Sequence, residues 1–233
     1  MRTPTSKVVF LGPSLDSNEA AKHLEARYLP PIRRGDLPRV IADGAQAIGI
    51  IDGEFGQSLA VSVMEISAGL KQGIHIWGAA SMGALRAVEC QSVGMLGVGW
   101  IFQKYAEGFL RADDEVALLF DPRSYSATTI PLVNVRWALQ TAIEEGVLSG
   151  SSEAALLKLA RAVRFTGRTY EALLEAVSGS PFNTEMRTLV EFMKKDPLRS
   201  DRKRLDALLL LEAMREGIPL PSPIGRNHGR SNA

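Results

Sequence analysis

Three short apolar runs in the first half of the chain end beside glycine, and a stretch with helical spacing follows each of them. The runs cover residues 8–11, 47–51 and 74–77. Apolar strands that alternate with helices are typical of a parallel sheet covered by helices. We therefore predict an α/β fold with a small, mostly parallel sheet flanked by helices, in which the ends of the strands line one crevice.

The periodicity of apolar residues divides the chain into an α/β part and a helical part. In the first part it predicts helices over residues 17–28, 37–45 and 59–72 and from Ser81 through Cys90, while residues 116–120 suit a last strand or a helix. After Pro122 the patterns are helical only, over 132–145, 152–163, 169–177, 182–194 and 202–215. We predict an α/β domain over 1–125, an all-helical region over 126–216 and a flexible tail over 217–233.

Composition narrows the classes of function. Lys and Arg number 27 against 26 Asp and Glu, so no overall charge favours nucleic acid or an anionic membrane as a partner. The apolar run after the polar start is too short for a signal peptide, and we expect a cytoplasmic protein. With a single cysteine and three scattered histidines, the chain shows no metal-ligand spacing, so we expect neither a metal nor another cofactor.

The third apolar run leads into Gly78-Ala79-Ala80-Ser81-Met82-Gly83, where a helix is expected to begin. Hydrolases expose a nucleophilic serine at a small-x-Ser-x-Gly turn, and N–H groups at the start of a helix hold the oxyanion. Residues 79–83 have this form, with alanine in place of the first glycine. Two other interpretations remain: an ordinary N-cap with glycines for close packing, and an anion site without catalysis.

Two charged residues are candidates for the same predicted crevice. Asp52 follows the second run, where it either orients a substrate or a base, or serves as a turn residue before Gly53. We expect Ser14, Asp52 and Ser81 to face a common space. Arg86 either pairs with Glu89 on the helix surface or holds a carboxylate in the crevice.

Other polar residues are assigned no chemistry at this point. His75, inside an apolar strand, is expected to be a core or edge residue, and Cys90 is expected to fill the core. Basic residues recur between positions 194 and 204, interrupted by Asp196 and Asp201, and this pattern predicts a solvated face.

Several segments together carry a resemblance to a known family. They are Val9-Phe10-Leu11-Gly12-Pro13-Ser14, Tyr28-Leu29-Pro30-Pro31, Gly35-Asp36, Ala47-Ile48-Gly49-Ile50-Ile51-Asp52-Gly53, Gly78-Ala79-Ala80-Ser81-Met82-Gly83-Ala84-Leu85-Arg86-Ala87, Gly94-Met95, Asp113-Asp114-Glu115-Val116-Ala117 and, more weakly, Val133-Asn134-Val135-Arg136. In this order and spacing, the sequence resembles the TfuA-like proteins, which accompany YcaO enzymes in the thioamidation of peptide backbones.

The resemblance implies a reaction and its partners. A small ubiquitin-like sulfur carrier (ThiS-like) that ends in a thiocarboxylate would be hydrolysed to release sulfide, and a YcaO enzyme would place that sulfur on a peptide amide. Ser81 is carried over as the serine of a serine–lysine pair. The residues expected to bind substrate or support the site are Asp52, Gly53, Glu65, Gly78, Met82, Gly83 and Arg86.

The chain departs from the family pattern at the lysine. The family has a His-Lys-Glu-Ile segment on the third helix, where this sequence reads Val63-Met64-Glu65-Ile66. Methionine cannot take a proton, so another base, such as Lys71 or a buried Glu65, replaces the lysine, or the protein is a non-catalytic module that brings peptide or carrier to YcaO.

Overall fold

The computed structural model describes residues 6–56 and 59–217. The predicted flexible tail lies, apart from Gly217, outside the described residues. Gly217 ends the last helix in a left-handed conformation, with φ of 67°.

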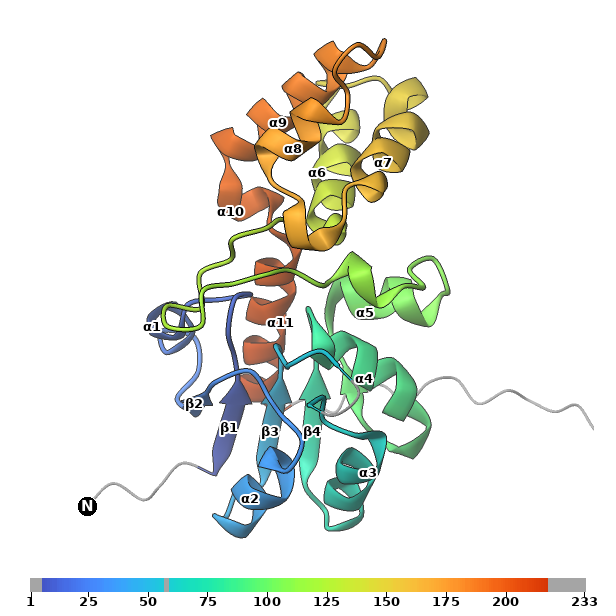
Figure 1. Ribbon diagram of the computed structural model, residues 1–233. Helices are drawn as coiled ribbons and strands as arrows, with labels where there is room; N and C mark the ends of the chain where they lie inside the picture. Colours follow the sequence, from blue (N-terminus) through green and yellow to red (C-terminus); the bar gives the residue numbers. More distant parts are fainter. Residues whose placement is uncertain (1–5, 57–58, 218–233) are drawn as a thin grey trace, which may run out of the picture.

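A five-stranded parallel sheet with strand order β2-β1-β3-β4-β5 forms the centre of the first half (Figure 1). The strands are β1 (Lys7–Phe10), β2 (Arg27–Leu29), β3 (Ala47–Ile50), β4 (His75–Gly78) and β5 (Leu96–Gly97). Each neighbouring pair is parallel, which confirms the predicted α/β class. All carboxyl ends therefore meet at one edge of the sheet.

The two outer strands were not predicted from the sequence. The helix expected over 17–28 ends early, as α1 (Ser17–Ala20), and β2 begins at Arg27. Tyr28 pairs with Val9 of β1, and its hydroxyl lies 2.8 Å from the carbonyl of Leu24. Pairing with a buried strand outweighs the local helical spacing in this segment, so this prediction was wrong over its second half.

One face of the sheet is covered by α2 (Asp36–Ala42), α3 (Val63–Lys71) and α4 (Met82–Cys90). Their apolar side chains share a core with Val8, Phe10 and Ile48 of the strands. Cys90 is fully buried there, which confirms its assignment to the core. The predicted helices are thus present, with shorter ends than expected.

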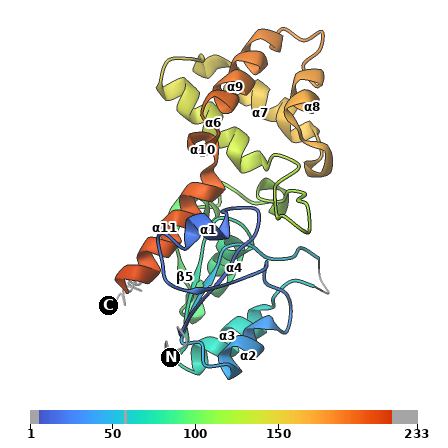
Figure 2. The same ribbon diagram turned by 90° about the vertical axis from the view of Figure 1, so that its left-hand side faces the viewer.

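The opposite face is covered by α11 (Arg202–Glu216), the last helix of the chain (Figure 2). Leu210 and Met214 pack against it so closely that a Cβ on Gly49 would lie 2.6 Å from the Met214 sulfur. The α/β domain expected over 1–125 therefore receives one of its layers from beyond residue 200. The helix α5 (Gly99–Ala106) lies beside α11.

A second, helical body lies beyond the carboxyl edge of the sheet (Figure 1). It consists of α6 (Leu132–Glu144), α7 (Glu153–Ala162), α8 (Tyr170–Glu175), α9 (Asn183–Lys195) and the short α10 (Pro197–Ser200). These helices have their own apolar core, around Leu139, Leu156 and Leu189. The predicted helical patterns of this region are confirmed.

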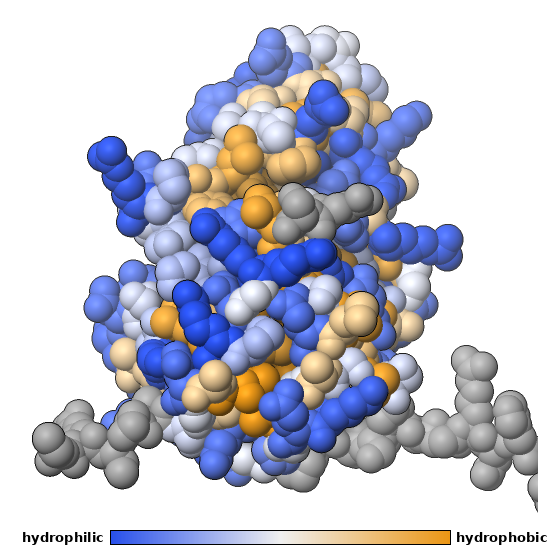
Figure 3. Space-filling model, turned by 60° about the horizontal axis from the view of Figure 1, so that its bottom comes forward, coloured by the Kyte–Doolittle hydropathy of each residue, from blue (hydrophilic) through white to orange (hydrophobic). Residues whose placement is uncertain are grey.

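The segment between the two bodies is irregular. Residues 116–120, expected as a strand or a helix, form neither, and a single bridge joins Phe120 to Ala127. Four short 3₁₀ helices complete the described elements: η1 (Gln91–Val93), η2 (Asp113–Glu115), η3 (Gly150–Ser152) and η4 (Phe165–Gly167). On the face turned forward in Figure 3, hydrophilic side chains separate several apolar patches.

Candidate functional site around Ser81

Ser81 follows a strained turn between β4 and α4. The Ser81 N–H donates to the carbonyl of Ala79 at 2.8 Å, and Ala80 between them has φ of 63°. A γ-turn with positive φ at a residue that carries a Cβ costs on the order of 1–3 kcal/mol. The surrounding core holds this conformation, since Ala79 and Ala80 are fully buried.

Two glycines allow the turn to lie directly on the sheet. A Cβ on Gly83 would be 1.8 Å from the carbonyl oxygen of Ile50, and one on Gly78 would be 2.1 Å from that of Gly83. No side chain fits at such distances from backbone. These glycines allow the start of α4 to lie against the end of β3.

The Ser81 hydroxyl does not cap α4. Ser81 occupies the N-cap position, but its side chain accepts no hydrogen bond from the first turn of the helix. The Gly83 N–H donates to the Ile51 carbonyl at 3.3 Å, and among the described residues the Met82 N–H has no acceptor. The interpretation of Ser81 as an ordinary N-cap is therefore wrong, and an N–H donor remains beside the hydroxyl.

Ser81 lines a small cavity of about 20 Å³. The polar groups that line it belong to Asp52, Ser81 and Lys203. Its other lining residues are mostly apolar: Pro13, Pro31, Gly53, Phe55, Val116, Leu118 and Phe120. Ser81 is only 3% exposed, so little of it meets bulk water.

Asp52 organises the ends of β1 and β3. Its carboxylate accepts hydrogen bonds from the N–H groups of Gly12 (2.9 Å) and Ser14 (3.0 Å) and from the Ser14 hydroxyl (2.7 Å). Asp52 and Ser81 line one cavity, as predicted, whereas Ser14 does not line it and contacts only Asp52 among these residues. Because both oxygens of this carboxylate already accept hydrogen bonds, Asp52 has a structural role at this edge of the sheet.

Lys203, near the start of α11, is the unexpected member of the site. Its ammonium donates to the Val116 carbonyl at 3.0 Å and lies 3.9 Å from Asp52 Oδ1, and its side chain is 1% exposed. Burial lowers the pKa of Lys203, although Asp52 and Asp201 oppose this shift. The expected solvated face is therefore wrong at this residue and at Arg202, which is also buried.

Two segments quoted for the family resemblance fix Lys203 and its carbonyl partner. Asn134 donates to Asp201 at 2.9 Å and accepts the Lys203 N–H at 3.3 Å, which anchors the first turn of α11. Arg136 makes two hydrogen bonds of 2.8 Å to the buried carboxylate of Glu115, next to Val116. Sequence reasoning missed these roles, because spacing alone does not show which distant residues meet.

Other residues proposed from the sequence lie away from the cavity. Glu65 forms a capping box with Ser62 at the start of α3 and also accepts the N–H of Gly35 at 2.6 Å. Burial opposes its ionisation, but these hydrogen bonds outweigh that effect and lower its pKa. Glu65 is therefore a structural acceptor in this fold, and the idea that burial makes it a base is wrong.

Arg86 and the two positions considered for the lysine are also elsewhere. Arg86 donates to the Val61 carbonyl at 2.8 Å and pairs with Glu89 at 2.6 Å, as the surface interpretation predicted. Met64 is 81% exposed. Lys71 is also exposed; it is the last residue of α3 and precedes β4, the strand that leads to Ser81. Neither position lines the Ser81 cavity.

Over residues 6–56 and 59–217, no group of three or more His, Cys, Asp and Glu side chains is arranged to hold a metal ion. Within the same ranges, no helix is both long and apolar enough to span a membrane.

A family model of known proteins matches half of this chain. The family model described as TfuA-like protein matches residues 52–169, which include Asp52, Ser81, Glu115, Asn134 and Arg136. Lys203 lies beyond the matched residues. A search among curated proteins found no match.

Proposed function

Because the chain belongs to the TfuA-like family, we propose that it hydrolyses a thiocarboxylated ubiquitin-like sulfur carrier and so supplies sulfide to a YcaO enzyme that thioamidates a peptide. In this proposal Ser81 is the nucleophile, Lys203 is the base, and no metal or other cofactor takes part. The protein would also help YcaO to bind its peptide.

The first step forms an ester between Ser81 and the carrier. The Ser81 hydroxyl gives its proton to neutral Lys203 as its oxygen attacks the carbon of the thiocarboxylate. The tetrahedral intermediate then breaks its C–S bond, and the sulfur leaves as hydrosulfide with the proton that Lys203 returns. Hydrosulfide leaves readily, so little further acid catalysis is needed.

The second step restores the enzyme. Neutral Lys203 accepts a proton from water, which attacks the ester carbon, and then protonates the Ser81 oxygen as the ester bond breaks. The products are free Ser81 and the carrier's carboxylic acid, which releases its proton to solvent and becomes the carboxylate. In both steps the N–H of Met82, at the positive end of α4, would donate to the oxyanion.

The observation that carries this function is the burial of Lys203 in the cavity of Ser81. A lysine acts as a base near neutral pH only when its pKa is lowered, and burial lowers that of Lys203. Asp52, bonded by Gly12 and Ser14, would hold the ammonium in place without competing for the proton.

Sulfide release from a thiocarboxylated carrier tests the proposal. We expect release by the wild-type protein and a loss of at least about a hundredfold in Ser81→Ala, because no other side chain of the cavity replaces the hydroxyl. Ser180→Ala, a serine of the helical body outside the cavity, is the matched control. Equal rates for wild type and Ser81→Ala would disprove catalysis by this residue.

A second candidate function is a non-catalytic module that brings peptide or carrier to YcaO. The small volume of the Ser81 cavity favours this function, since about 20 Å³ holds no more than about one water molecule. If the module is the true function, Ser81→Ala will leave peptide thioamidation by YcaO unchanged while omission of the protein abolishes it.

A further inference from the structure

The cavity of Ser81 is too small for an acyl group to react in it as it stands. Its volume of about 20 Å³ holds about one water molecule, whereas a thiocarboxylate carries several non-hydrogen atoms. Ser81 itself is only 3% exposed. Part of the cavity lining must therefore move before a substrate reaches the hydroxyl.

The lining at the sheet edge is held by close packing and by backbone hydrogen bonds. Pro31 packs so tightly on the end of β1 that a Cβ on Gly12 would lie 2.5 Å from Pro31 Cγ. Phe55 follows Glu54, whose N–H donates to the Ile32 carbonyl at 3.0 Å. This side of the cavity therefore belongs to the body of the sheet.

A more loosely held wall comes from the irregular segment over residues 118–128, which supplies Leu118 and Phe120 to the cavity. Within the part of the chain that the structure describes, every hydrogen bond of this segment stays within residues 118–129. The Thr128 N–H, for example, donates to the Leu119 carbonyl at 2.8 Å. A segment that is bonded to itself alone can move as a unit without breaking hydrogen bonds to either body.

Both ends of this segment are fixed. Val116, before it, is fully buried, and its carbonyl accepts the Lys203 ammonium at 3.0 Å. After it, the Ile130 N–H donates to the Arg168 carbonyl at 2.7 Å, and the buried Arg168 guanidinium donates to the Ile130 carbonyl at 3.3 Å. The chain between these two points is thus placed to move about hinges at its ends.

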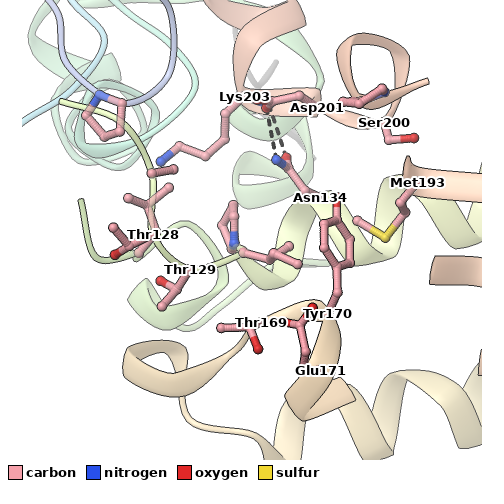
Figure 4. Close-up of a pocket in the computed structure, with 16 residues that line it drawn as sticks. Thr128, Thr129, Asn134, Thr169, Tyr170, Glu171, Met193, Ser200, Asp201 and Lys203 are labelled. Atoms are coloured by element: carbon pink, nitrogen blue, oxygen red, sulfur yellow. Dashed lines mark hydrogen bonds between the residues drawn. The ribbon is translucent and has the colours of Figure 1, made fainter. Parts of the chain in front are cut away.

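Open space on two sides leaves the segment room to move. A cavity of about 200 Å³ is lined by Ser124 and Ser126 from the segment and by Ser17 of α1. Another, of about 370 Å³, lies between Thr128 and Tyr170 of the helical body (Figure 4). A close-packed element resists displacement, whereas an element beside hollows of this size loses little packing when it shifts.

We propose that residues 118–128 form a lid that moves away from the sheet edge to admit the acyl donor to Ser81 and then closes over it. This rests on the proposed function, because it assumes that an acyl group reacts at Ser81. Opening withdraws Phe120 from the cavity, while Val116, outside the lid, keeps its hydrogen bond to Lys203. The lid therefore exposes the hydroxyl without displacing the proposed base.

A thiol in place of the Ser81 hydroxyl reports access to the cavity without catalysis. We would measure by mass spectrometry the alkylation of Ser81→Cys by iodoacetamide, with wild type as the background for the buried Cys90. Adding Phe120→Ala removes part of the cover and should raise the rate at position 81 at least about tenfold. Phe109→Ala, at an exposed phenylalanine outside the cavity, should not change it. Equal rates in the two variants would show that Phe120 does not control access.

A tether tests the movement itself. Ser17→Cys and Ser126→Cys add exposed thiols on two sides of the 200 Å³ cavity, and one equivalent of a short bismaleimide joins them before it reaches the buried thiol at position 81. We expect the tether to slow alkylation at position 81 at least about tenfold. Single variants at positions 17 and 126, treated with N-ethylmaleimide, carry the modification without the tether and are the controls. An unchanged rate in the tethered protein would refute movement of the lid.

Carrier hydrolysis with Ser81 intact separates this proposal from the proposed function. The tethered protein should release sulfide at least about tenfold more slowly than the singly modified controls, and cleavage of a reducible tether should restore the rate. If no form of the protein releases sulfide, the proposed hydrolysis is wrong, while the alkylation rates still decide whether the lid moves. Full release of sulfide by the tethered protein would overturn the lid and leave the proposed hydrolysis standing.

Discussion

Lys203 Nζ lies 3.9 Å from Asp52 Oδ1, and both side chains are buried. Lys203 lies in the first turn of α11, the last helix, and Asp52 follows β3, the central strand of the sheet. The pair therefore joins this helix to this strand at the cavity of Ser81. The nearer partner of the ammonium is the Val116 carbonyl, at 3.0 Å. Asp52 therefore acts on Lys203 as a charge at short range, and the hydrogen bond of the ammonium goes to the Val116 carbonyl.

Replacement of this lysine should remove the base. We expect Lys203→Met to slow carrier hydrolysis by about 10²–10⁴-fold, the usual contribution of a positioned base, while the apolar stem remains packed. The rate of sulfide release under single-turnover conditions is the measurement. Lys195→Met, an exposed lysine on α9, is the matched control and should keep the wild-type rate. A Lys203→Met protein as active as this control would show that Lys203 is not the base.

The rate should also depend on pH in a defined direction. Neutral Lys203 is the active form, so hydrolysis should rise with pH, with a midpoint below the ordinary lysine pKa of about 10.4 because burial lowers it. Lys203→Arg should abolish this rise, since a guanidinium stays protonated. Sulfide release measured across neutral and alkaline pH checks both expectations. A midpoint at or above the ordinary value would contradict the role of burial.

The same group links stability to pH. Between its lowered pKa in the folded protein and its ordinary pKa in the unfolded chain, Lys203 binds fewer protons in the folded protein than in the unfolded chain. The free energy of unfolding should therefore rise with pH across that window. Urea denaturation at several pH values measures it. Lys203→Met should flatten this part of the curve, and an unchanged slope would mean that another group causes it.

The glycine that supports the serine turn gives a prediction on stability. A Cβ at Gly83 would stand 1.8 Å from the Ile50 carbonyl oxygen, so Gly83→Ala must push α4 away from the sheet and should cost more than about 3 kcal/mol. Gly167→Ala, where a Cβ meets nothing within 4 Å, should change stability by less than about 0.5 kcal/mol. Thermal unfolding of both variants is the measurement, and similar midpoints would show that the turn has room to shift.

The sequence predicted the parts of the site that follow from local pattern. Apolar runs that end in glycine located the carboxyl edge of the sheet, and strand ends at one edge brought Asp52 and Ser81 together. The spacing of Gly78 and Gly83 likewise indicated a close approach of helix and strand. Each of these inferences needs only the geometry of parallel strands and the absence of a side chain.

The proposed base, Lys203, could not be found in this way. Lys203 lies in a run of charged residues whose pattern is typical of a solvent-exposed face. Its burial depends on α11 crossing the sheet, which Leu210 and Met214 decide by packing around Gly49. The hydrophobic pattern predicted a helix there, but not which surface that helix would cover.

The placement of α11 gives the last prediction. Asp206 accepts hydrogen bonds from the N–H groups of Trp100 (3.0 Å) and Ile101 (2.7 Å) at the start of α5, and from Arg202 Nε (2.9 Å). Burial raises the pKa of Asp206, although Arg202 opposes this. Arg202→Leu leaves that carboxylate buried without its cation and should destabilise the protein by about 3 kcal/mol.

The pH dependence of that loss has a definite sign. Because Arg202 favours the charged form of Asp206, its loss raises the pKa of that carboxyl further in the folded state, so the deficit of Arg202→Leu in unfolding free energy should grow as pH rises from acid to neutral. Arg215→Leu breaks the exposed pair with Glu212 and should change stability by less than about 1 kcal/mol at any pH. Urea denaturation of both variants at acid and neutral pH is the measurement.

Because Lys203 adjoins Arg202, Arg202→Leu should also slow carrier hydrolysis. A variant that is destabilised yet fully active would show that α11 holds Lys203 without the Arg202–Asp206 pair.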